Sequence, residues 1–179
     1  MRLLLERDGI DVNLQDEDSN TALLAACRDG HREIVELLLQ KVDLNLNAQG
    51  LNKFTALLFA SQNGHRDIVR LLLERDGIDV NLQDEDGDTA LIAACRWGHT
   101  EIVELLLRKP DIDVTKKDNN GRTALMIATD NHHTEIIDRL ERCLNLRNLL
   151  LMKETEETTY GGRILKNHYD IKRLVASWL

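Results

Sequence analysis

The sequence has little of what several common classes of protein require. It contains one proline and only 3% aromatic residues among 179, which favours helices and short turns over a β-sandwich. Three cysteines, an odd number, argue against a secreted disulfide scaffold. No apolar run approaches the ~20 residues that span a bilayer. The opening MRLLLERDG becomes charged too soon for a signal peptide. We therefore expect a soluble, cytoplasmic chain without a membrane partner.

The chain also lacks an excess of basic charge. Its formal net charge is −8, whereas binding to the phosphates of nucleic acid requires clustered Lys and Arg. We therefore expect no nucleic-acid partner. A negative chain is instead suited to a protein partner with a basic surface.

Motifs for catalysis are absent as well. The sequence has no Ser-His-Asp elbow, no phosphate-binding GxxxxGK[ST], no HExxH and no CxxC. Its acidic DED turns lack the spacing of a calcium loop. Cys27 and Cys95 stand beside small alanines and are interpreted as buried, inert thiols. We predict no catalytic residue, no metal site and no cofactor.

What the chain does have is an internal repeat. RLLLERDGIDVNLQDED stands at residues 2–18 and again at 70–86. A Thr-Ala-Leu triplet recurs every 34 residues, starting at Thr21, Thr55, Thr89 and Thr123. A Gly-His pair follows at residues 30–31, 64–65 and 98–99, and the fourth copy reads His132-His133. Each pair precedes an apolar block such as EIVELLL. Repeats of this length are typical of solenoids.

Each repeat predicts two helices and a loop. The threonine is placed to cap a short first helix, and the glycine after that helix supplies a turn with positive φ. The apolar block forms a second helix with an acidic residue in its first turn. The Asp- and Asn-rich stretch that follows indicates an extended arm and a turn.

These residues carry a resemblance to a known family. The segment DEDGDTALIAACRWGHTEIVELLL, residues 84–107, resembles the ankyrin repeat, whose pattern includes TPLH, Gly-His and a leucine-rich second helix. The resemblance implies an all-α ankyrin-repeat solenoid with extra C-terminal helices. The chain departs from TPLH at two positions. Alanine replaces the proline in every copy, and the histidine is replaced by Leu24, Leu58, Ile92 and Met126, so we expect apolar packing in its place.

The period divides the chain into six segments. We expect an N-terminal half repeat at 1–15 and ankyrin repeats at 16–49, 50–83 and 84–117. A terminal repeat and following helix occupy 118–152, and 153–179 form an acidic linker and a C-terminal amphipathic helix. That last helix either caps the array or binds another chain. Because the chain begins inside a repeat, we expect a frayed or partner-covered N-terminus.

Two stretches of forty residues are nearly identical. Residues 2–41 and 70–109 differ at six positions, which include Asn20/Asp88 and Asp29/Trp97. Trp97 is therefore a residue that the fold does not require.

The histidines have a structural interpretation. One histidine per repeat, at 31, 65, 99 and 133, places equivalent side chains about 10 Å apart, too far to share one zinc. We expect them to brace the loop before the second helix.

The resemblance also implies a binding surface. In the family, partners contact the loop tip, the residue before the capping threonine and the end of the first helix. The partner-binding positions that follow are Leu51, Phe54, Glu85, Asp86, Asp88, Arg96, Trp97, Asn119, Asn120 and Arg122. Phe54 and Trp97 would act as hot spots, with Glu85, Asp86 and Asp88 attracting a basic partner. The alternative is that each aromatic side chain folds over the neighbouring repeat.

The function predicted is a non-catalytic protein-interaction module, a scaffold or adaptor. Two alternatives stay open. One is a regulatory or targeting segment of a larger multidomain enzyme or of a secreted, host-directed effector. The other is a homo-oligomeric scaffold that pairs through its exposed N-terminal edge, although we expect a monomer.

Overall fold

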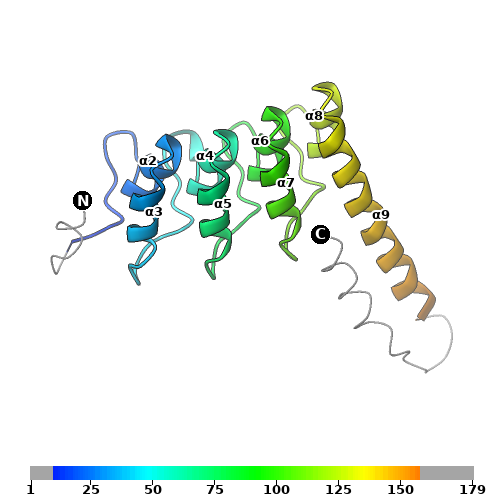
Figure 1. Ribbon diagram of the computed structural model, residues 1–179, viewed down its shortest axis with the longest axis horizontal. Helices are drawn as coiled ribbons and strands as arrows, with labels where there is room; N and C mark the ends of the chain where they lie inside the picture. The colour runs from blue at the N-terminus through cyan, green and yellow to red at the C-terminus, as the bar shows by residue number, and fades with distance from the viewer. Residues whose placement is uncertain (1–9, 158–179) are drawn as a thin grey trace.

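The fold is an array of helix pairs. The computed structural model describes the backbone of residues 10–157 and the side chains of residues 10–147. Within that range the chain forms four antiparallel-stacked pairs that follow one another in chain order (Figure 1). The pairs are α2 (Ala22–Asp29) with α3 (Arg32–Leu38), α4 (Ala56–Gln62) with α5 (Arg66–Leu73), α6 (Ala90–Trp97) with α7 (Thr100–Leu107), and α8 (Ala124–Asp130) with α9 (Thr134–Glu157). The expected all-α repeat fold is confirmed.

Each first helix begins at a threonine cap, as predicted. The Thr21 hydroxyl accepts a hydrogen bond from the backbone N–H of Leu24 at 3.3 Å. The hydroxyls of three other threonines accept the same bond from the N–H three residues later in the sequence, at 3.2 to 3.3 Å: Thr55, Thr89 and Thr123. Each cap satisfies one N–H that the helix leaves without a partner, which contributes about 1 kcal/mol.

The Gly-His pair joins neighbouring repeats. Gly30 has a φ of 77°, and a Cβ there would lie 2.7 Å from the ring of His65 in the next repeat. Nε2 of His65 lies 3.2 Å from the Arg28 carbonyl oxygen at the end of α2. The same contact recurs twice, between His99 and Gln62 at 3.0 Å and between His133 and Arg96 at 3.4 Å. The histidines therefore brace the loop, as predicted, and they also hold the preceding repeat.

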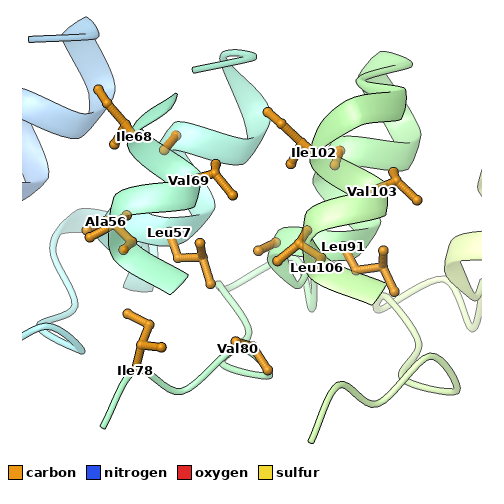
Figure 2. Close-up of a cluster of buried hydrophobic side chains, with 14 of the residues drawn as sticks. Ala56, Leu57, Ile68, Val69, Ile78, Val80, Leu91, Ile102, Val103 and Leu106 are labelled. Carbon is orange, nitrogen blue, oxygen red and sulfur yellow. The ribbon is translucent and has the colours of Figure 1, made fainter. Parts of the chain in front are cut away.

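The core is continuous between repeats. Figure 2 shows Leu57, Ile68 and Val69 of one repeat beside their equivalents in the next, Leu91, Ile102 and Val103. The positions that replace the family's histidine, Leu24, Leu58 and Ile92, are each 1% exposed. The expected apolar packing is confirmed at these three positions, but not at Met126 in the last repeat.

The last repeat shows which positions face a neighbour. Met126 is equivalent to Ile92 but is 50% exposed, and Ile137 is partly exposed where Val103 is fully buried. Glu141 is equivalent to Leu107 of the third repeat, which is buried. No further repeat covers α8 and α9 within residues 10–157, so the exposed side of this pair carries more polar residues, as terminal repeats require.

The arms between repeats are tied by asparagine side chains. Asn47 donates to the Gly77 carbonyl at 2.8 Å and accepts from the Asp79 N–H at 2.9 Å. Asn13 and Asn81 make the same two bonds one repeat away. At the loop tips, the Glu85 N–H donates to the Asn52 carbonyl at 2.9 Å. Backbone groups that helices do not satisfy are therefore paired between repeats.

The C-terminal helix is longer than predicted. The linker was expected from residue 153, but α9 is continuous to Glu157. Its last residues, KETEE, contain helix-favouring Lys and Glu and no glycine or proline, so nothing in this stretch ends the helix. Residues 1–9 and 158–179 lie outside the described residues. They include the leucines of the N-terminal half repeat and the predicted C-terminal amphipathic helix.

One core position holds cysteine in two repeats and serine in another. Cys27, Ser61 and Cys95 are equivalent and 0% exposed, and burial raises the pKa of both thiols to about 12. The Ser61 hydroxyl has no hydrogen-bond partner. We expect Ser61→Cys to raise the free energy of unfolding by about 1 kcal/mol, because it removes an unsatisfied buried hydroxyl. Chemical denaturation measures this change.

The matched control is Cys27→Ser, which places the same hydroxyl in the first repeat. It should lower the unfolding free energy by a similar amount. Equal stability of Ser61→Cys and the unaltered protein would contradict the burial cost.

Candidate functional site

The ten predicted site residues lie on the loop tips and first helices of the second, third and fourth repeats. Six of them are exposed: Leu51, Glu85, Asp86, Trp97, Asn119 and Asn120. Four are half-buried: Phe54, Asp88, Arg96 and Arg122. The structure brings two of these side chains, Asp88 and Arg96, into direct contact with each other.

Trp97 is the largest exposed apolar side chain of this surface. It is the last residue of α6, just before the left-handed Gly98 that ends the helix. Its side chain is 58% exposed. The equivalent residues Asp29, Asn63 and Asn131 are exposed too, so this position faces solvent in every repeat. More than half of Trp97 therefore lies in solvent, which favours an exposed side chain over the alternative that it folds over the neighbouring repeat.

Phe54 differs from this pattern. Its ring stacks on Phe59 with the two centroids 4.6 Å apart and the planes 20° from parallel. Phe54 is thus a half-buried partner of its own first helix, α4, and not a free aromatic side chain. Sequence reasoning missed Phe59, although it replaces the alanine found at residues 25 and 93. That replacement was the signal that could have identified it.

The loop tip of the second repeat is built differently from the others. Asp84 accepts hydrogen bonds from the backbone N–H groups of Asp86 and Asp88 at 2.9 and 2.8 Å. The second repeat has Gly50 at the position of Asp84 and cannot form these bonds. A Cβ at Gly50 would lie 2.6 Å from Oδ1 of Asn20, so the neighbouring repeat fills that space.

The same tip holds strained backbone. The 3-10 turn η1 (Leu51–Lys53) contains two consecutive non-glycine residues with positive φ, Asn52 at 55° and Lys53 at 61°. Glycine occupies the position of Lys53 in the third and fourth repeats, at Gly87 and Gly121. Such conformations cost about 1 kcal/mol or more each and occur often at functional sites. The turn presents Leu51 with 56% of its surface exposed.

Four charged side chains form one chain of ion pairs. Arg96 donates to both oxygens of Asp88, from Nη2 at 2.6 and 2.8 Å and from Nε at 3.1 Å. It also lies 3.5 Å from Asp118. Asp118 accepts from Nε and Nη2 of Arg122 at 3.0 and 2.8 Å. Asp88 was predicted to attract a basic partner, and the structure differs, because its carboxylate is already paired.

The two buried turn aspartates differ in acidity. Burial raises the pKa of Asp84, although backbone N–H bonds from Asp88 and Asp86 oppose it. Burial acts on Asp118 in the same direction, but the backbone N–H and the guanidinium of Arg122 outweigh it and lower the pKa. The difference follows from the arginines, which approach Asp118 and leave Asp84 with carboxylate neighbours.

The described part of the chain offers neither a metal site nor a membrane-spanning helix. No group of three or more His, Cys, Asp or Glu side chains there could hold a metal ion. None of its helices combines the length and the apolar character that a membrane crossing needs.

These features define a solenoid of stacked helix pairs whose loop tips and first helices form one extended surface. A family model for ankyrin repeats, three copies long, matches residues 1–84 and again residues 76–146. The chain therefore belongs to the ankyrin repeat family, whose members are generally protein–protein interaction modules and typically non-catalytic. No curated protein matches the chain significantly.

Asp118 and Asp84 offer a matched pair of substitutions. Asp118→Asn keeps the oxygen that caps Asn120 and Arg122 but removes the charge that pairs with two arginines. We expect it to lower the unfolding free energy at pH 7 by about 1–2 kcal/mol. Asp84→Asn should leave stability unchanged or raise it, because that carboxylate faces Asp86 and Asp88.

The pH dependence separates the two substitutions further. The pKa of Asp118 is lowered in the folded state, so its contribution is complete above the unfolded pKa of about 3.9 and is lost as pH falls through the folded value. The cost of Asp118→Asn should therefore vanish in acid. An equal cost for both substitutions at pH 7, or a cost independent of pH, would contradict this assignment.

Proposed function

We propose that this protein is a non-catalytic scaffold or adaptor that binds a protein partner on the loop tips and first helices of its second, third and fourth repeats. The observation that carries the proposal is Trp97. An aromatic side chain that is 58% exposed stands where the nearly identical first copy has Asp29. A tryptophan in solvent costs free energy in the isolated chain, and large aromatic side chains are enriched among interface hot spots.

Other apolar groups of the same surface support this proposal. Leu51 is exposed on the strained tip of the second repeat. In the same repeat, Phe54 at the end of that tip stacks on Phe59 of α4. The tip of the fourth repeat carries the exposed polar residues Asn119 and Asn120, which lie next to the tip of the third repeat. Apolar anchors within a polar rim are the usual anatomy of a protein interface.

The charge of the surface favours a partner with a basic face. The exposed carboxylates among the described residues of this surface are Glu85, Asp86 and Asp130, while Lys53 is an exposed cation at a tip. Asp88 contributes less than expected, because Arg96 neutralises it. Opposite charge across an interface raises association rates and selects partners. In this proposal the chain acts as a monomer in the cytoplasm and binds no nucleic acid.

Trp97→Ala tests the proposal directly. Because the side chain packs little, the unfolding free energy should change by less than about 0.5 kcal/mol. Partner binding should weaken by about 2 kcal/mol or more, as for hot-spot residues. An affinity capture with both proteins, followed by identification of what differs and titration of the purified partner, measures this loss.

Asp29→Ala provides the matched control, since it truncates the equivalent position of the first repeat. It should leave the binding of that partner unchanged. A large loss of stability in Trp97→Ala with unaltered affinity would show that the tryptophan serves the fold.

A further inference from the structure

The same arginine has different partners in the two nearly identical copies. Arg28 and Arg96 both end an AACR sequence on a first helix. In the first copy, Nε of Arg28 donates to the next residue, Asp29, at 2.9 Å, and both side chains are 47% exposed. This arginine lies at the surface with a solvated neighbour, and such exposed pairs are weak.

Three sequence differences change the partners of the arginine in the third repeat. Asp29, which pairs with Arg28, is replaced by Trp97 in the third repeat, so Arg96 has no carboxylate at the next residue. Asp88 and Asp118 hold Arg96 instead. Their equivalents around Arg28 are Asn20 and Gly50, neither of which carries a charge.

The new pairing withdraws Arg96 from the surface. Its side chain is 29% exposed, against 47% for Arg28. Three hydrogen bonds to Asp88 occupy its Nε and Nη2 donors in a fork-shaped arrangement, which is the strong form of an arginine–carboxylate contact. Because Asp88 already balances the charge of Arg96, an acidic group on a partner gains less from this arginine than from one without a carboxylate neighbour.

The exposed charge on the tip of the third repeat is therefore acidic. Asp88 and Arg96 cancel each other, as do Asp118 and Arg122. Glu85 and Asp86 remain exposed on the tip of the same repeat. Like-charge repulsion against the wrong partner is a common source of specificity.

We infer that Asp88 is a specificity-determining residue of the surface formed by the tip and the first helix of the third repeat, which includes Glu85, Asp86 and Trp97. We call it the Trp97 surface. By holding Arg96, Asp88 makes this surface accept a peptide segment with an apolar side chain flanked by Lys or Arg, and reject one flanked by Asp or Glu. The inference rests on the proposed function, because it requires Trp97 to contact a protein segment.

Defined peptides test this inference with the full chain. The probes are fluorescein-labelled twelve-residue peptides with a central Leu-Phe pair, flanked by four arginines, four glutamates or four serines, and an arginine peptide without the apolar pair. Fluorescence anisotropy gives the Kd of each probe. For the unaltered protein, we expect the arginine-flanked peptide to bind at least about tenfold tighter than the glutamate-flanked one.

Two substitutions should move this ratio in opposite directions. Asp88→Asn, which copies the first repeat, removes one negative charge and leaves Arg96 with Asp118 as its remaining carboxylate neighbour, so the ratio should fall below about threefold. Arg96→Gln frees the Asp88 carboxylate, so the ratio should rise. Because the two variants predict opposite shifts, a general loss of folding in either one cannot imitate the result, and circular dichroism checks that both remain helical.

The possible outcomes separate the two claims. A tenfold preference that Asp88→Asn abolishes, together with binding that Trp97→Ala removes, supports both. Binding that depends on Trp97 but not on the flanking charge, or a ratio that Asp88→Asn leaves unchanged, overturns the role of Asp88 and leaves the proposed function standing. Failure of every peptide to bind, or binding indifferent to Trp97→Ala or to loss of the Leu-Phe pair, overturns both.

Discussion

The contact between neighbouring repeats is the constraint on which the rest of this structure depends. A pair of helices seven or eight residues long cannot bury its apolar faces alone. Val35, Val69 and Val103 are fully buried because another pair follows each of them. The contact has a polar part too, in which a histidine ring approaches the backbone of the preceding repeat and requires glycine beneath it. Both parts recur every 34 residues, which is why the sequence repeats.

The same constraint shows which residues are free to serve function. The end of each first helix faces solvent, and the residue there changes from Asp29 to Asn63, Trp97 and Asn131 while the helix shortens by at most one residue. The residue before the capping threonine varies as well, from Asn20 to Phe54, Asp88 and Arg122. Both changes concern the same arginine: Arg28 pairs with Asp29 in the first repeat, whereas Arg96 pairs with Asp88 in the third, where Trp97 has replaced that aspartate.

The fold could be predicted because its determinants are local and repeated. Thr21 and its equivalents cap the helices, Gly30 and its equivalents end them, and the apolar blocks form the second helices, as expected from the period. The candidate site was harder. The exposure of Trp97 followed from comparison of two copies, but the pairing of Asp88 with Arg96 depends on side chains eight residues apart and on a carboxylate in the next repeat. The stacking of Phe54 on Phe59 is likewise a contact between side chains. The Asn20 side chain also approaches Gly50 closely and leaves no room for a Cβ there. No spacing rule indicates these contacts. The end of α9 was misplaced because a charged, Thr-rich stretch resembles a linker, while its Lys and Glu residues are equally suited to a helix.

The central claim is that the third repeat carries its unusual residues for binding and not for folding. The most direct measurement is the unfolding free energy of the double substitution Asp88→Asn with Trp97→Asp, which restores the residues of the first copy at both positions. Because Arg96 then regains the neighbour that Arg28 has, the account predicts a value within about 0.5 kcal/mol of the unaltered protein. A loss of several kcal/mol would contradict it, since Asp88 and Trp97 would then be parts of the core that holds the repeats together.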